Sequence, residues 1–193
     1  AGQTTPVAVG LAAGMYTVTV TDVGGCEFVA TAFVIEPVNA FIANAFESKV
    51  VTCKGGNDGA LTVNAAHGWG YYMYSIDNIT YYNYLTSNVL SGLSAGNYTV
   101  HIFDDEGCEL YLPVTITEPA IALAVTAVES EPVKCYGGSD GEITATPVGG
   151  WGGYTFSIDG GLTWQTSPVF AGLTAGVYTV EVMDSVGCVE STP

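Results

Sequence analysis

Basic side chains are almost missing from this chain of 193 residues. Three Lys and Arg stand against nineteen Asp and Glu, so the formal net charge is −16 at pH 7. Such a chain repels phosphate backbones and anionic lipid headgroups, and it has no basic patch with which to hold either. The composition therefore excludes nucleic-acid binding.

Long apolar runs are missing too, although hydrophobic residues make up 48% of the sequence. They alternate with Thr, Ser, Gly and Asn, and no run reaches the roughly 18 residues that indicate a membrane-spanning helix. We therefore expect no direct membrane insertion. The first six residues contain neither Met nor the basic and apolar segments of a signal peptide, so we expect the sequence to begin inside a longer protein.

What the sequence does contain is a motif that occurs three times. It reads Gly-Leu-x-Ala-Gly-x-Tyr-Thr-Val, then Asp, then Gly-Cys, and it spans residues 10–26, 92–108 and 172–188. The first two copies are 82 residues apart and the last two are 80 apart, as the numbers of their final Cys residues show. A fixed period of this kind indicates a tandem array.

The period divides the chain into three parts. We expect residues 1–37 to be the C-terminal part of a preceding repeat, residues 38–119 to be a complete repeat, and residues 120–193 to be a repeat that lacks its last strand. Each period holds short runs rich in β-branched and aromatic residues, separated by Gly- and Asp-rich turns. About seven strands in 80–100 residues are typical of an immunoglobulin-like β-sandwich, and a small barrel is the main alternative.

We therefore predict an all-β chain of tandem immunoglobulin-like sandwiches. The tyrosine of each motif, at Tyr16, Tyr98 and Tyr178, stands where such a sandwich has its tyrosine corner. In that corner the hydroxyl group bonds back to the preceding chain, so these three residues are predicted to be structural.

The five cysteines follow the same period. Cys53 can pair with Cys108, and Cys135 with Cys188, which gives one disulfide per repeat and leaves Cys26 for a partner in a preceding repeat. A bridge that closes a loop of about 55 residues contributes roughly 4 kcal/mol of stability from chain entropy. Structural disulfides predict an oxidising, extracellular compartment.

Groups that carry chemistry do not recur as a set. His67 and His101 are matched by Gly149 and Glu181 in the next repeat, and the cysteines occur singly, so zinc is the weaker interpretation. Because no nucleophile, base and orienting group repeat together, we predict that the chain is not an enzyme and has no catalytic cofactor.

Aspartates recur in two kinds of turn. Asp58 and Asp140 lie in Gly-Gly-x-Asp-Gly turns, while Asp22, Asp104 and Asp184 follow the Tyr-Thr-Val strand. Ca²⁺ at module junctions is one interpretation, because calcium needs several oxygen ligands. The other, which we favour, is that each Asp caps its own turn.

Aromatic residues crowd into one hairpin of the complete repeat. Adjacent strand residues point to opposite faces, so these side chains cannot all face the core. An exposed aromatic patch would stack on sugars or pack against a neighbouring repeat or fibre. The candidate surface-contact residues are Trp69, Tyr71, Tyr72, Tyr81, Tyr82 and Tyr84.

The motifs together resemble the SprB repeat family. They are Cys-x-Gly-Gly-x-Asp-Gly from residues 53 and 135, Gly-Trp-Gly from 68 and 150, Ser-Ile-Asp from 75 and 157, and the Tyr-Thr-Val motif. The last repeat fits best, and the complete repeat departs from the pattern at residues 77–82. SprB repeats occur in very long cell-surface adhesins and filaments of Bacteroidota, including gliding-motility adhesins exported by type IX secretion.

The resemblance implies an adhesive or structural segment at the cell surface. Asp184-Ser185-Val186 is similar to the O-glycosylation tripeptide of Bacteroidota, which makes Ser185 a candidate acceptor. The expected partners are neighbouring repeats of the same chain, other copies in a fibre, and surface glycans. A carbohydrate-binding accessory module of a large secreted enzyme is the alternative, and self-assembly by strand exchange is a third hypothesis.

Overall fold

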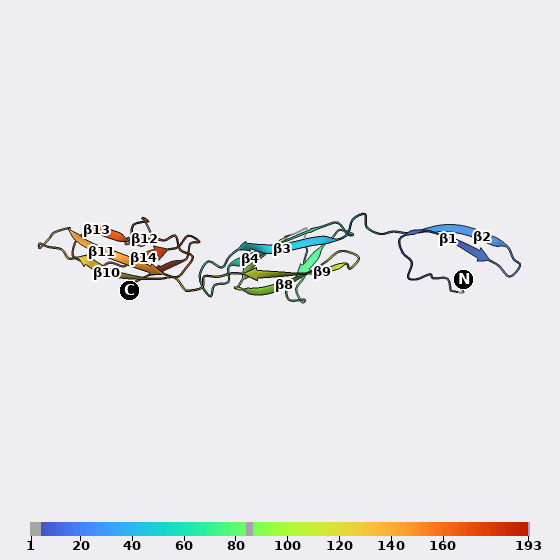
Figure 1. The fold of residues 1–193 in the computed structure, drawn as a ribbon, viewed down its shortest axis with the longest axis horizontal. Coiled ribbons are helices and arrows are strands. Elements are labelled where there is room, and N and C mark those ends of the chain that lie inside the picture. Colours follow the sequence, from blue (N-terminus) through green and yellow to red (C-terminus); the bar gives the residue numbers. More distant parts are fainter. Residues whose placement is uncertain (1–4, 84–86, 193) are drawn as a thin grey trace.

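The computed structural model describes residues 5–83 and 87–192. Every regular element in this part of the chain is a β-strand, and it contains no helix that could cross a membrane. Three bodies follow one another in a line along the long axis of the molecule (Figure 1). The all-β prediction is confirmed.

The first body is a hairpin that we call the N-terminal hairpin. Strands β1 (Gly14–Thr21) and β2 (Glu27–Val34) pair antiparallel from Gly14 opposite Val34 to Thr21 opposite Glu27. Its turn at residues 22–26 contains the first Gly-Cys sequence.

The second body, the middle sandwich, has seven strands in its described residues, arranged in two antiparallel sheets. One sheet has the order β3-β4-β7 and the other the order β6-β5-β8-β9. Their bounds are β3 (Ile42–Lys49), β4 (Gly59–Ala66), β5 (Met73–Ser75), β6 (Tyr82–Asn83), β7 (Val89–Leu93), β8 (Gly96–Phe103) and β9 (Glu109–Ile116). The predicted immunoglobulin-like sandwich is confirmed.

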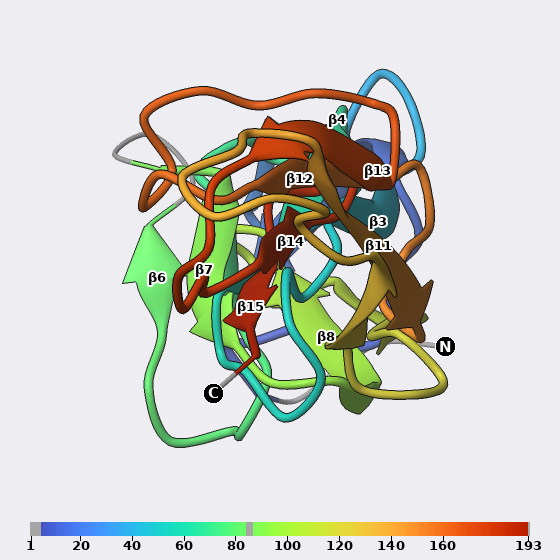
Figure 2. The same ribbon diagram turned by 90° about the vertical axis from the view of Figure 1, so that its left-hand side faces the viewer.

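The third body, the C-terminal sandwich, repeats this plan with sheets β10-β11-β13 and β12-β14-β15. Figure 2 shows it along the long axis, with its strands in front of those of the middle sandwich. Its strands are β10 (Ala124–Glu131), β11 (Gly141–Val148), β12 (Thr155–Ser157), β13 (Val169–Leu173), β14 (Glu181–Met183) and β15 (Val189–Ser191).

Each sandwich has its own apolar core, built by alternation along the strands. In β8, Val100 and Ile102 are fully buried against the core, and Phe103 is half-buried on the other face. Val180 and Val182 occupy the matching core positions of the C-terminal sandwich. The two cores lie in separate repeats, and Cys53 of the middle repeat packs against the core of the C-terminal sandwich.

The tyrosine corners form as predicted in all three copies of the motif. The hydroxyl groups of Tyr16, Tyr98 and Tyr178 each donate to the carbonyl oxygen of the residue four positions earlier, at 2.9, 2.9 and 3.0 Å. The motif therefore fixes the entry into the penultimate strand of each repeat.

Cys53 and Cys108, the two cysteines of the middle sandwich, lie at opposite ends of it. The loop that holds Cys53 lies beside the end of β9, where the Val51 amide donates to the Thr117 carbonyl at 2.8 Å. Cys108 lies in the turn before β9, eight strand residues away. At about 3.3 Å per residue, the two ends of this strand are some 26 Å apart.

Candidate functional site: the junction between the sandwiches

The disulfide joins the two sandwiches instead of closing either one. Cys53 bonds to Cys188, 135 residues later, with a Cα–Cα distance of 5.2 Å. The predicted pairing of Cys53 with Cys108 and of Cys135 with Cys188 is therefore wrong. The physical reason is the length of the strands, because a disulfide needs Cα atoms within about 7 Å and a repeat holds its two cysteines at opposite ends.

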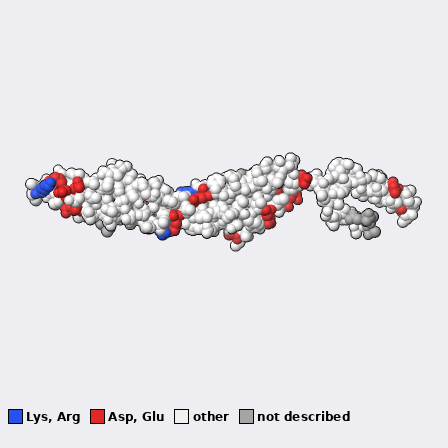
Figure 3. Space-filling model, in the orientation of Figure 1, with Lys and Arg blue, Asp and Glu red and all other residues white. Residues whose placement is uncertain are grey.

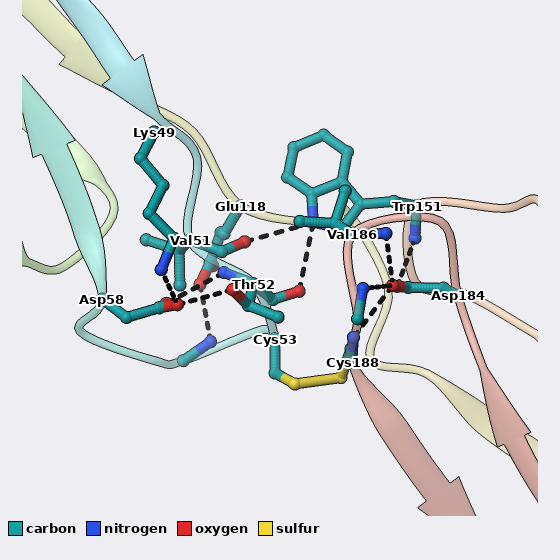
Figure 4. The surroundings of a disulfide bond; sticks show 12 residues. Lys49, Val51, Thr52, Cys53, Asp58, Glu118, Trp151, Asp184, Val186 and Cys188 are labelled. Atoms are coloured by element: carbon teal, nitrogen blue, oxygen red, sulfur yellow. Dashed lines mark hydrogen bonds and ion pairs between the residues drawn. A yellow bond between two sulfur atoms is a disulfide. The ribbon is translucent and has the colours of Figure 1, made fainter.

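Trp151 forms the second contact across this junction. Its indole Nε1 donates to the carbonyl oxygens of Val51 and Thr52, at 3.1 and 3.2 Å. Figure 4 shows the indole ring from the C-terminal sandwich beside the backbone that leads into Cys53. One side chain thus recognises the backbone that positions the cysteine.

Asp184 holds the contacting end of the C-terminal sandwich in shape. Its Oδ1 accepts the backbone N–H groups of Val186, Gly187 and Cys188 at 3.0 Å each, and its Oδ2 accepts that of Trp151 at 2.9 Å. This buried carboxylate therefore ties the turn of Cys188 to the loop of Trp151 (Figure 4). We call residues 150–152 and 184–188 the docking end.

Glycine is required at the start of Gly-Trp-Gly. Gly150 has φ +61°, and a Cβ atom there would lie 2.6 Å from Asp184 Oδ2. A side chain would both strain the backbone and displace the carboxylate. The Gly-Trp-Gly motif is thus explained by the approach of the loop to Asp184.

The partner of the docking end is the loop of residues 51–58, which we call the cysteine loop. Asp58 caps it, because Oδ1 accepts the Thr52 amide at 2.9 Å and Oδ2 accepts Lys49 Nζ at 2.7 Å. The hydrogen bonds from Lys49 and Thr52 hold the pKa of Asp58 well below its ordinary value. Asp58 is therefore ionised at neutral pH and orders the backbone that Trp151 contacts.

The linker between the sandwiches is strapped to the same loop. Glu118 Oε2 accepts the Gly55 amide at 2.6 Å, and this bond lowers the pKa of Glu118. Lys54 Nζ donates to the carbonyl oxygens of Pro119 and Ala120 at 3.3 and 3.0 Å. The Glu118-Pro119 sequence, which also occurs one period earlier at residues 36–37, is part of the junction.

The aspartates considered for calcium act on their own turns. Asp104 Oδ1 accepts the amides of Glu106 and Cys108, its Oδ2 accepts that of Trp69, and Asp22 Oδ1 accepts the amides of Gly24 and Cys26. Burial opposes the ionisation of Asp104, but these N–H groups outweigh it and lower its pKa. Asp140 Oδ1 accepts the Lys134 amide at 3.1 Å. These contacts favour the capping interpretation.

Across residues 5–83 and 87–192, no cluster of three or more His, Cys, Asp or Glu residues could hold a metal ion. Cys26, Cys108 and Cys135 are free and exposed in this structure. They lie in three different turns, so they do not form a thiolate site with one another.

The candidate aromatic surface divides between core and solvent. Tyr72 is half-buried, donates to the His67 carbonyl at 2.7 Å and stacks on Phe41. Tyr71, Tyr81 and Tyr82 are exposed, whereas Trp69 is half-buried and Tyr84 lies outside the described residues. Three of the five candidates that the structure describes thus remain available for contact.

Sequence reasoning missed the rings that pack with Tyr81, of which His101 is itself buried. His101 and Tyr111 are opposite each other in the β8–β9 register and stack with ring centroids 4.5 Å apart and planes 4° from parallel. Tyr81 meets His101 edge-on at 6.3 Å and Phe103 at 5.5 Å. The signal was the alternation of β8, which turns His101 and Phe103 away from the core.

Ser185, the candidate glycosylation site, is exposed in the turn of the docking end, and its amide donates to the Gly152 carbonyl at 2.8 Å. A modification at Ser185 would therefore project beside the junction.

Charged side chains gather near the ends of the bodies and leave their flanks mostly uncharged (Figure 3).

Comparison with known families supports the interpretation of the motifs. The family model of the SprB repeat matches residues 45–80 and 127–163, the same segment of two consecutive repeats. No curated protein matches the chain. Repeats of this family occur in cell-surface proteins and are non-catalytic modules, and a disulfide suits an oxidising, extracellular environment. The two matches confirm the resemblance to the SprB repeat family at two positions of the chain.

Proposed function

We propose that this chain is a spacer segment of an extracellular surface adhesin or filament, in which consecutive repeats are held in line by a fixed junction. The observation that carries the proposal is the disulfide between Cys53 and Cys188, which crosses from one repeat to the next. Trp151 and the strapped linker add two further contacts at the same place. Three attachments between two rigid bodies restrict both bending and rotation.

A flexible hinge between the repeats would need neither the disulfide nor the hydrogen bonds of Trp151. Domains joined by a flexible linker move relative to one another unless their interface is large or otherwise fixed. Here the fixing is covalent, and the backbone contacts of Trp151 set its geometry. The junction therefore supports a stiff rod, which suits a role in holding an adhesive end away from the cell.

Small-angle X-ray scattering tests this rigidity. The unmodified chain is expected to keep one maximum dimension. The variant that combines Cys53→Ser with Lys54→Ala lacks the bridge and the Lys54 contacts to the linker, so its distance distribution should be shorter and broader. Cys135→Ser is the matched control, because that cysteine is free. Identical scattering from all three proteins would refute the spacer proposal.

We propose further that the outer face of the β6-β5-β8-β9 sheet is a contact surface. Tyr81, His101 and Tyr111 form one continuous aromatic cluster there, and Tyr111 is 58% exposed. The C-terminal sandwich has Glu181 and Ser191 at the positions of His101 and Tyr111, so the cluster is particular to the middle repeat. This difference also supports the alternative of a carbohydrate-binding module, because aromatic faces stack on sugar rings.

Attachment measurements separate these roles. Replacing Tyr81 and Tyr111 by Ser should reduce binding of chain-coated beads to polysaccharide surfaces, with Tyr136→Ser as the control, because Tyr136 is exposed on a distant loop. Unchanged attachment would remove the contact surface and leave the spacer role standing.

A further inference from the structure

The cysteine loop occurs a second time, and the second copy is open. In the C-terminal sandwich the corresponding loop runs from Val133 to Asp140, at the end of the molecule that faces away from the junction (Figure 1). A hollow of about 450 Å³ lies there, lined by residues 133–138 with Thr174 and Ala175. In the middle sandwich the matching loop is contacted by Trp151 and Cys188 of the docking end, and also by the linker at Glu118.

The open loop already has the shape of the occupied one. The Gly138 amide donates to the Cys135 carbonyl at 2.9 Å, as the Gly56 amide does to the Cys53 carbonyl at 2.9 Å. The glycine between them has φ +77° in one loop and +79° in the other. Asp140 caps the Lys134 amide as Asp58 caps that of Thr52. No rearrangement of the backbone is needed before docking.

Several groups at the second loop are accessible. Val133 is half-buried, whereas Val51 at the matching position is fully buried in the core of its own repeat with Ile116. Cys135 is exposed as a free thiol, and Tyr136 beside it is fully exposed. The side chain of Val133, the carbonyl groups of Val133 and Lys134 and the thiol of Cys135 thus lie together at one tip.

The docking end also occurs a second time. In the middle sandwich, Asp104 Oδ2 accepts the Trp69 amide at 3.0 Å and its Oδ1 accepts the Cys108 amide at 2.9 Å, the contacts that Asp184 makes to Trp151 and Cys188. Cys108 is exposed, whereas Cys188 is only 2% exposed. Each sandwich therefore has a cysteine loop at one end and a docking end at the other.

We infer that the tip around Cys135 is a docking site for a further SprB repeat, which inserts the indole of its Gly-Trp-Gly motif against the carbonyl groups of Val133 and Lys134 and bonds its Gly-Cys thiol to Cys135. Every repeat is then locked to the next by the same disulfide, and Cys108 serves the preceding junction. This inference concerns the association of repeats and does not depend on what the surface binds.

Bond formation needs an oxidant. The thiol of Cys135 and the thiol of the incoming cysteine lose two protons and two electrons together, and a disulfide-bearing oxidant, either a thiol–disulfide oxidoreductase or oxidised glutathione, accepts them and leaves as two thiols. Thiolate attack on the oxidant gives a mixed disulfide, which the second thiol then resolves. Docking places the two sulfur atoms side by side, so the second step is intramolecular.

An in-register duplication tests the inference. Residues 109–188 form one 80-residue period, so a chain of residues 1–188 followed by 109–193 presents Cys135 of the first copy to a second copy of the observed docking end. The lengthened chain has two additional cysteines. After oxidation by glutathione and denaturation, we expect its free thiols to remain three, as in the unmodified chain, with a new bridge between the first Cys135 and the second Cys188.

The controls separate docking from random oxidation. Cys135→Ser in the first copy should leave the second Cys188 free without disturbing the bridge between Cys53 and the first Cys188. A second lengthened chain, residues 1–119 followed by 38–193, should join the first Cys53 to the second Cys108. Five free thiols in the first chain and an unpaired second Cys108 in the other, with β-rich circular dichroism retained, would overturn the inference. If either chain does not fold, the other decides alone.

Discussion

Replacing Cys53 by Ser should change the length to which the chain can be stretched. When the chain is pulled by its two termini, the bridge between Cys53 and Cys188 carries the tension. The segment between the two cysteines, which are 135 residues apart in the sequence, is then not stretched. A fully extended chain spans about 3.3–3.6 Å per residue, so the shielded segment corresponds to about 450–490 Å. Subtracting the 5.2 Å between the two Cα atoms leaves nearly all of this difference.

Single-molecule pulling measures that length directly. The oxidised chain should reach a contour length about 440–480 Å shorter than the same chain in dithiothreitol. Cys53→Ser should be long under both conditions. Cys135→Ser should behave like the unmodified chain, because Cys135 is free. The tension would thus bypass strands β4 to β14 and would load the middle sandwich only through β3, which precedes Cys53.

The competing pairing gives a different result. Bridges from Cys53 to Cys108 and from Cys135 to Cys188 would shield 55 and 53 residues, as the differences of the residue numbers show. The shortening would then be about 350–390 Å, and Cys135→Ser would lengthen the oxidised chain by about half of it. A change of this kind in the Cys135→Ser variant would refute the reasoning.

Three further predictions follow from the contacts of the turns and the junction. Trp151→Phe keeps an aromatic ring but removes the donor to the carbonyl groups of Val51 and Thr52, so urea unfolding should show a free energy of unfolding lower by about 1 kcal/mol. Trp69→Phe, the matching change in the middle sandwich, should alter the free energy of unfolding little. Equal effects of the two changes would contradict the role of Trp151 at the junction. Hydrogen bonds from Thr163 and Ser157 lower the pKa of Asp159 to about 2. The stability that the ionised carboxylate contributes to the folded state is therefore complete above the unfolded pKa near 3.9 and is lost as the pH falls toward 2. Asp159→Asn should make the melting temperature fall less steeply between pH 4 and pH 2, and an unchanged slope would contradict this account. Melting with and without EDTA should give the same transition, because backbone N–H groups occupy the carboxylates of Asp104 and Asp184, whereas a lower melting temperature in EDTA would restore calcium at the junctions.

Much of the fold follows from the sequence because it is local. The period is visible in the motif, and alternation in strands such as β8 places Val100 and Ile102 in the core. The tyrosine corner depends only on residues four apart, so the hydrogen bond from Tyr98 to the Ser94 carbonyl does not depend on contacts with distant segments. These features require no knowledge of how repeats meet.

The pairing of the disulfide could not be predicted from the pattern within one repeat, because the bridge joins two repeats. Pairing within a repeat looked natural for Cys53 and Cys108, which bracket one unit. Counting strands would have corrected it: Cys53 follows the first strand of its sandwich and Cys108 follows the sixth, and in an antiparallel fold such turns lie at opposite ends. The role of Glu118 was missed because its partner Gly55 lies 63 residues earlier in the same repeat, and only the fold brings the two residues together.

The outer aromatic cluster shows a third limit. Tyr81 was predicted from crowding in the hairpin, but His101 and Tyr111 come from different strands, and only their register brings the rings together. Sequence periodicity gives the face of each residue, and pairing between strands decides its neighbours.

Disulfide mapping tests the central claim most directly. The chain should be oxidised with glutathione, alkylated, digested without reduction and analysed by mass spectrometry. We predict a single cross-linked peptide pair that joins Cys53 to Cys188, with Cys26, Cys108 and Cys135 alkylated. Peptide pairs joining Cys53 to Cys108 and Cys135 to Cys188 would contradict a covalent lock between consecutive repeats.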